Sequence, residues 1–323
     1  MRKEVLYALL AGAFMGIIIA FGVWRANSAF KPNGNETSED APAITPPPQF
    51  GITVAKPDNL SVISENPTVI SGITLADSWV VISIKDNDYI IKSMEDGSFS
   101  REVNLKGGVN QLQISALGPK GEVVENKLTL VYSTGFSSSQ TSSPEKASPT
   151  PDNQNATEGS EIRQKVIEKV EQALKNPKAL LGVITDISIN TLQIKIPSGE
   201  IQQMSVLSDA TIVKVDKASK EVKFSDIAIG DFVIGMGYKN GNNILEAGRV
   251  LITQQPDEFI VKAAIGKMSS FDKAIISTDT YFSTYKNGKI TKTGISGISE
   301  DDLVIVVTED IKGITARTIL VIE

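Results

Sequence analysis

The sequence predicts a mainly β protein held by a single N-terminal transmembrane helix. Three observations lead to this fold class: an unbroken apolar run near the N-terminus, many short apolar segments separated by turn residues, and an internal repeat in the C-terminal half. In chain order we expect the membrane helix, a β-sandwich, one amphipathic helix and two small β-barrel repeats. The β character follows because Gly, Asn, Asp and Pro punctuate the short runs at turn spacing.

The apolar run covers residues 5–24, and no charged side chain interrupts it. A helix needs about 20 such residues to cross the hydrocarbon core of a bilayer. Arg2 and Lys3 precede the run, which favours a cytoplasmic N-terminus. A cleaved signal peptide is the alternative, although its apolar region is usually only ~7–15 residues long. We therefore expect a single-pass signal-anchor in the cell membrane, surrounded by membrane lipid, with the bulk of the chain extracytoplasmic.

Small side chains recur along one face of this expected helix. Residues four apart share a helix face, and the small residues at that spacing are Ala8, Gly12, Gly16 and Ala20. In lipid, close backbone approach over small residues lets two helices pack. The pattern predicts a homodimer through the anchor. The alternative is that Gly and Ala are simply common in membrane helices.

Changes in composition divide the rest of the chain. A Pro-rich segment around Pro46–Pro48 indicates a linker that spaces rather than packs. A later Ser/Thr/Pro-rich segment has too few apolar residues to offset its ordering entropy. The expected domains are 1–25, the membrane anchor; 26–50, the Pro-rich linker; 51–133, the β-sandwich; 134–159, the Ser/Thr/Pro-rich linker; 160–255, the helix with the first small β-barrel; and 256–323, the second small β-barrel.

About seven short apolar runs between residues 51 and 132, without a helical period, are typical of a β-sandwich. We expect Trp79, in the third run, to belong to the sandwich core. Four stretches resemble the bacterial Ig-like modules of surface proteins, similar to those that accompany glucodextranase-type enzymes: Val69–Gly72, Trp79–Ile82, Asp96–Phe99 and Gly108–Leu112. The resemblance implies an Ig-like module on an exported protein, and such modules often lack a disulfide.

Residues 160–175 have a helical period instead. Ser160 suits the N-cap, and charged residues fill the face opposite the apolar one. The apolar positions are Ile162, Val166, Ile167, Val170 and Leu174. We expect this helix to pack on the domain that follows, with self-association as the alternative.

The C-terminal half repeats. Residues 208–232 align without gaps to residues 278–302. Asn240-Gly241 and Asn287-Gly288 are hairpin-turn signals, so each copy predicts a barrel of five or six strands. The element Gly230-Asp231-Phe232-Val233 is similar to a "GDxV" element of small tandem β-barrel domains of unknown function in exported bacterial proteins. In the second copy Glu300 replaces the Gly.

Composition removes several kinds of chemistry. The chain has no Cys and no His, which excludes disulfides, thiol catalysis and Ser-His arrangements. A net charge of -6 without a basic cluster argues against nucleic acid as a partner. Ser270 and Lys273 fit the S-x-x-K pattern of penicillin-recognising enzymes, but in a module too small for that fold. We expect no enzymatic activity and no cofactor.

Two acidic patterns leave alternatives open. Asp86-Asn87-Asp88 offers oxygen ligands for Ca²⁺ but lacks the further ligands of a calcium loop, so a plain hairpin turn is favoured and no metal is expected. Paired carboxylates of the kind that hydrolyse glycosides are not excluded by a composition with 38 acidic residues.

Aromatic residues gather on one expected hairpin of the second repeat, at Tyr281, Phe282 and Tyr285. We predict a contact with an envelope glycan or protein there, with Phe282 in the barrel core and half-buried tyrosines as the alternative. The function expected is a membrane-anchored binding or adhesion protein that presents β-domains at the cell envelope. The alternatives are a structural spacer or scaffold, and an accessory module or enzyme that acts on envelope carbohydrate.

Overall fold

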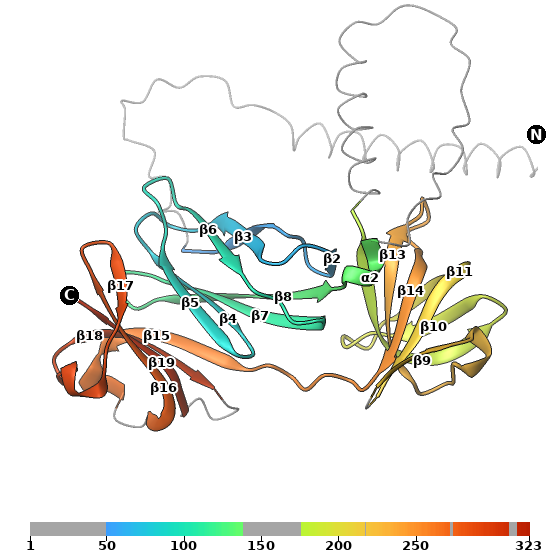
Figure 1. Ribbon diagram of the computed structural model, residues 1–323. Coiled ribbons are helices and arrows are strands. Elements are labelled where there is room, and N and C mark those ends of the chain that lie inside the picture. Colours follow the sequence, from blue (N-terminus) through green and yellow to red (C-terminus); the bar gives the residue numbers. More distant parts are fainter. Residues whose placement is uncertain (1–49, 138–175, 217, 272–273, 310–314) are drawn as a thin grey trace, which may run out of the picture. The chain divides into compact units, whose positions relative to one another are not determined.

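The computed structural model describes residues 50–137, 176–216, 218–271, 274–309 and 315–323, and these residues are mainly β, as predicted (Figure 1). The expected anchor, its row of small residues and the expected helix at 160–175 lie outside the described residues. Within the described ranges, no helix is both long and apolar enough to cross a membrane. The described residues belong to one compact unit.

Two sheets form the first module. One is three-stranded, in the order β1-β3-β6, and the other carries the strands in the order β2-β8-β7-β4-β5. Alternate side chains of both sheets meet in a shared core, for example Ile70 and Phe99 from the first sheet and Ile82 and Ile114 from the second. The strands are β1 Thr53–Lys56, β2 Ser61–Ile63, β3 Thr68–Ile73, β4 Trp79–Ile84, β5 Asn87–Lys92, β6 Ser98–Val103, β7 Gly108–Leu117 and β8 Val123–Tyr132.

The first repeat is a closed barrel, as predicted. Each of its ring strands pairs with two neighbours in the cyclic order β9-β10-β11-β14-β13, and β13 returns to β9. Fully buried side chains such as Leu192, Met204 and Val233 fill its interior. A short helix, α2 Thr134–Ser137, follows β8 and precedes this repeat in the chain (Figure 1). The elements are β9 Lys178–Ser188, β10 Thr191–Lys195, β11 Ile201–Val215, β12 Ser219–Val222, η1 Phe224–Asp226, β13 Phe232–Lys239 and β14 Leu245–Thr253.

The second repeat is a five-stranded sheet in the order β15-β18-β19-β16-β17. Among its described residues no pairing joins β15 to β16 or β17, so the second closed barrel that the sequence predicted is not formed by these residues. The 3-10 helix η2 follows β15, whereas β10 follows β9 in the first repeat. The elements are β15 Val261–Lys267, η2 Met268–Phe271, β16 Ile275–Lys286, β17 Lys289–Lys292, η3 Ile295–Gly297, β18 Leu303–Glu309 and β19 Thr315–Ile322.

The two copies share strand pairing and irregularities, which confirms the repeat. In each copy a long strand pairs in parallel with the last strand, and the register shifts at the same place: between Val206 and Thr211 in β11, and between Ile276 and Tyr281 in β16. The gapless alignment is wrong from β12 onward, because the turn after the long strand is one residue longer in the second copy: three residues separate the paired Val215 and Ser219, and four separate the equivalent pair Tyr285 and Ile290.

The corrected alignment explains the "GDxV" element. A carboxylate oxygen of Asp231 accepts a hydrogen bond from the N–H of Ala228 at 2.9 Å. Asp302 does the same for the N–H of Ser299 at 2.7 Å. The Asp therefore satisfies a turn backbone in both copies.

The two predicted hairpin signals have different outcomes. Asn287 and Gly288 have φ angles of 52° and 80°, and the flanking Lys286 and Lys289 pair directly. This is the two-residue turn that Asn-Gly favours. Asn240 instead begins a longer connection, residues 240–244, in which its side-chain oxygen accepts from the N–H groups of Asn242 and Ile244.

Candidate functional site

The three predicted aromatic residues do not share one surface. Phe282 packs against the core of the second repeat. Tyr285 contacts Trp79 of the sandwich edge-on, with ring centroids 4.8 Å apart and planes at 87°. Tyr281 is 47% exposed, and the amine of Lys292 lies 5.7 Å from its ring centroid. A role of these residues in partner or glycan binding stays a prediction, and Tyr281 is the exposed one of the three.

The prediction that Trp79 belongs to the sandwich core is wrong. Trp79 is buried in a second cluster with Val81 of the same strand and with Ile305 and Leu320 of the second repeat. Neighbouring residues of a strand point to opposite faces, so β4 sends Val80 into the sandwich core and Trp79 away from it. All of β4 is buried because the second repeat covers its outer face.

Both repeats contact the sandwich through the same outer strand face. In the first repeat, Ile234, Met236 and Leu251 pack against Val62, Val131 and Phe136 of the segment 62–136. The structurally equivalent side chains of the second repeat are Ile305, Val307 and Leu320, and they pack against Trp79, Val81, Ile90 and Leu117. The same face of the two repeats thus contacts two different surfaces of the sandwich.

A buried ion pair accompanies the contact of the second repeat. Asp88 of β5 has a side chain only 1% exposed, and its carboxylate lies 3.4 Å from Nε of Arg317. The Thr318 hydroxyl donates to the same carboxylate at 2.7 Å. Arg317 also donates to the carbonyl of Ile84 at 2.8 Å and pairs with Glu309. The low dielectric of the interface makes this pairing stronger than a surface ion pair.

Both acidic side chains of the Asp86-Asn87-Asp88 pattern have cationic side-chain partners. Asp88 is paired with Arg317, and Asp86 forms an ion pair with Lys106. The hydrogen bond from Lys106 lowers the pKa of Asp86. In the part of the chain that the structure describes, no group of three or more acidic side chains is placed to hold a metal ion.

The connection between the two repeats is held against the sandwich as well. The side-chain amide of Gln111 donates to the carbonyl of Asp257 at 3.0 Å and accepts from the N–H of Phe259 at 3.1 Å. This geometry imitates a strand pairing, because one side chain satisfies both a donor and an acceptor of the backbone. Lys127 and Glu258 lie 3.3 Å apart beside it.

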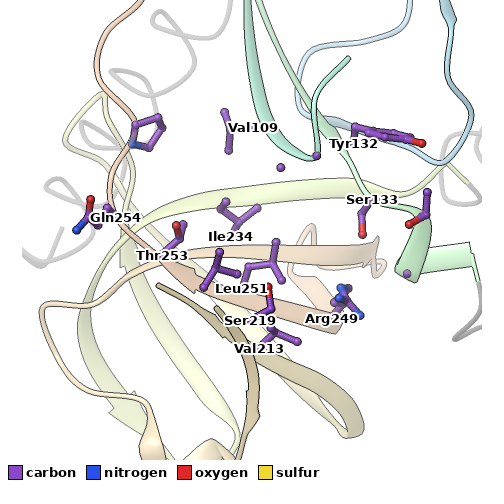
Figure 2. Close-up of a pocket in the computed structure, with 16 residues that line it drawn as sticks. Val109, Tyr132, Ser133, Val213, Ser219, Ile234, Arg249, Leu251, Thr253 and Gln254 are labelled. Carbon is purple, nitrogen blue, oxygen red and sulfur yellow. The ribbon is translucent and has the colours of Figure 1, made fainter. Parts of the chain in front are cut away.

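A cavity of about 470 Å³ lies where the first repeat meets the end of the sandwich. The barrel supplies Ile234, Arg249 and Leu251 to its lining, and the sandwich side supplies Val109 and the segment 132–135. Figure 2 shows Arg249 at one end of this cavity and Gln254 at the other. Among the described lining residues, Arg249 carries the one charge.

The guanidinium of Arg249 lies close to backbone. A Cβ atom on Gly135 would come within 3.0 Å of its Cζ and Nη1 atoms. The Nε atom of Arg249 is shielded from solvent and has no hydrogen-bond partner among the described residues. A buried donor without a partner costs about 1–3 kcal/mol, so this group marks a place where a partner would be stabilising.

Sequence reasoning missed Arg249, Arg317 and Gln111. The signal for the two arginines was visible, because each lies in or beside an apolar β-run at the end of its repeat. A charged residue in such a run is seldom buried unless it is paired. Gln111 carried no comparable signal, since a polar residue at an outward strand position is ordinary.

No family model matches the chain, and no curated protein matches it in sequence. Three solved structures are similar to it at low identity. A tetra-tandem repeat from the extending region of a large adhesion protein has 13% identity over 84% of this chain and 72% of that chain, with a TM-score of 0.21. A Ca²⁺-stabilized adhesin with which an Antarctic bacterium binds ice has 14% identity over 85% of this chain and 74% of that one, with a TM-score of 0.18. A third, from a 1.5-MDa bacterial ice-binding adhesin, has 12% identity over 84% of this chain and 95% of that chain, with a TM-score of 0.19. TM-scores of this size do not establish a common fold.

Proposed function

We propose that this chain is a membrane-anchored, extracytoplasmic binding or adhesion protein that presents its β-modules at the cell envelope as one assembly. The observation that carries the proposal is the contact of both repeats with the sandwich through one equivalent strand face. Buried apolar contacts of this kind fix modules relative to one another, whereas polar interfaces leave them free to move. A fixed arrangement suits a protein that presents a surface.

The finer parts of the proposal come from the sequence and the sheet order. The strands β1, β3 and β6 form one sheet and β4, β7 and β8 belong to another, and this order supports the proposal that the module is an Ig-like sandwich, in which strands A, B and E pack on C, F and G. The apolar run at 5–24 is the proposed anchor, with a homodimer through its small residues. Binding rather than catalysis is proposed because composition provides neither Cys nor His.

A structural scaffold is the second candidate function, and one observation favours it. The two hydrogen bonds of the Gln111 side chain hold the backbone of the connection between the repeats against the sandwich. A spacer needs such rigidity but no ligand, whereas an adhesion protein needs both.

Co-sedimentation of the full-length chain with insoluble envelope polysaccharide separates the two functions. The binding function predicts saturable co-sedimentation that Tyr281→Ala weakens several-fold, since an exposed aromatic ring is a typical contact for a partner. The matched control is Ile290→Ala, a substitution on the same hairpin at a residue that is 40% exposed. Absence of saturable binding to polysaccharide and to membrane-protein fractions would favour the scaffold, and release of reducing ends would favour an enzyme.

A further inference from the structure

The cavity at Arg249 has features of a ligand site that the proposed function does not require. We propose that it binds a small organic anion, with one carboxylate or phosphate group held by the guanidinium of Arg249. This inference goes beyond the proposed function and stands independently of it, because an assembly that only spaces or adheres has no need for a charged cavity.

The first argument is the state of Arg249. Its Nε has no hydrogen-bond partner among the described residues although solvent does not reach it. No carboxylate is present among the described residues that line the cavity. A planar guanidinium presents a fixed fork of donors that matches the oxygens of a carboxylate or phosphate. Arg249 therefore brings a positive charge to a cavity whose described lining offers it no counter-charge.

The second argument comes from the equivalent place in the second repeat. Arg249 is the first residue paired with β11 after the bulge, and Thr318 is the first residue paired with β16 after its bulge. There the sandwich provides the carboxylate of Asp88, which Thr318 and the adjacent Arg317 both contact. At the first repeat the sandwich provides only uncharged residues to the cavity. The anion that the protein supplies in one copy is missing in the other.

The remaining walls define the body of the ligand. Val109, Ile234 and Leu251 give apolar contacts, while Ser133, Ser219 and Thr253 carry hydroxyl groups. Figure 2 shows Ile234 and Leu251 between the Arg249 end and the Thr253 end. Sites for small molecules are typically of about 300–1,000 Å³ and combine apolar walls with a few polar groups. The cavity fits a sugar-sized anion, such as a uronic acid or a sugar phosphate.

Gly135 completes the site. Its lack of a side chain lets the guanidinium lie against the backbone, because a Cβ there would approach Arg249 to 3.0 Å. A side chain at this position would therefore push the guanidinium away from its place, and a branched one would push it further, which gives a second way to perturb the site.

Isothermal titration calorimetry on the full-length chain tests the proposal, with D-glucuronate, D-glucose 6-phosphate and neutral D-glucose as probes. We expect saturable binding of at least one of the two anions, and the stronger of them identifies the anionic group. Glucose should bind at least 10-fold more weakly than that anion, because it has no charged group to form charge-assisted hydrogen bonds with the guanidinium.

The variants assign any binding to this cavity. Arg249→Gln should weaken the affinity for the anion 10- to 100-fold and leave the thermal unfolding midpoint unchanged. Gly135→Val should weaken the affinity as well. The matched control is Arg101→Gln, which removes an exposed arginine of β6 outside the cavity and should leave the affinity unchanged. The proposal is overturned if neither anion binds saturably, if glucose binds as tightly as the anions, or if Arg249→Gln binds as well as the parent chain.

Discussion

The two repeats are copies of one strand plan, yet they differ in closure and in the way they meet the sandwich. The first repeat closes on itself through β10, whereas the second has η2 after its first strand and leaves its ring open among the described residues. At the position where the second repeat carries Arg317, the first carries Gly248. The repeat that lacks a closing strand is the one with a buried ion pair to the sandwich.

This difference shows how similar modules become specialised. The apolar docking face is common to both copies, because it follows from side chains that alternate along equivalent strands. Polar partners are specific to one contact, because each buried charge needs an opposite charge or a hydrogen-bonding group directly beside it. Three experiments test how the repeats differ.

The largest effect is expected from Arg317→Met. This substitution leaves the carboxylate of Asp88, which is 1% exposed, without its cationic partner. Removing one member of a buried pair typically costs 3–5 kcal/mol, so we expect a loss of roughly 3 kcal/mol in the free energy of unfolding while Thr318 still contacts Asp88. Urea denaturation of the full-length chain measures this loss.

Arg249→Met is the matched substitution in the first repeat. Arg249 has no ion pair among the described residues and its Nε lacks a hydrogen-bond partner there, so Arg249→Met should not lower the free energy of unfolding. Adding Asp88→Asn to Arg317→Met should restore part of the loss, because the unpaired charge is then removed. Equal losses for Arg317→Met and Arg249→Met would contradict the difference between the two contacts.

A smaller effect is expected at two equivalent glycines, Gly182 of β9 beside β10 and Gly266 of β15 beside η2. A Cβ on Gly182 of β9 would lie 2.3 Å from the carbonyl oxygen of Lys195 in β10. Backbone of a closed ring has little freedom to retreat, so Gly182→Ala should cost about 2 kcal/mol. In the second repeat, the nearest atom to a Cβ on Gly266 is the Ser270 hydroxyl at 2.9 Å.

The Ser270 side chain can rotate away at the cost of its hydrogen bond to the Lys267 carbonyl. Gly266→Ala should therefore cost no more than about 1 kcal/mol. Gly248→Ala serves as the control, since nothing lies within 4 Å of a Cβ there. Thermal unfolding followed by circular dichroism compares the three variants, and an equal cost at Gly182 and Gly266 would show that closure does not distinguish the repeats.

The smallest effect concerns pH. Lys286, at the end of β16, donates to Glu323 at 2.7 Å, and this hydrogen bond raises the pKa of Lys286 above its ordinary value of 10.5. A group whose pKa is higher in the folded than in the unfolded state stabilises the fold fully at pH values below its unfolded-state pKa. This stabilisation is lost as the pH rises through the folded-state pKa. The difference in unfolding midpoint between the parent chain and Lys286→Met should therefore shrink above about pH 10.5. A difference that grows with alkaline pH would have the wrong sign for this pair.

The β character, the repeat and one of the two tight turns could be predicted from the sequence alone. These features are local: alternating apolar residues specify a half-buried strand, and Asn287-Gly288 adopts the positive φ angles that its turn requires. The closed first barrel was also predictable, because its strand count and turn spacing resemble those of small barrels. The anchor at 5–24 and the contact at Tyr281 remain predictions from sequence.

The assignment of apolar residues to one core or the other could not be predicted, because it depends on how the modules pack. Trp79 and Val80 are neighbours with similar apolar character, yet one contacts the second repeat and the other the sandwich interior. Strand periodicity predicts that the two side chains point to opposite faces of the sheet, but it does not predict that both faces are covered by other residues. The Asp88–Arg317 pair, and the lack of a partner for Nε of Arg249 among the described residues, depend likewise on residues far apart in the chain. Their pairing follows from how modules dock, because the energy of a buried charge is set by the groups that surround it in space.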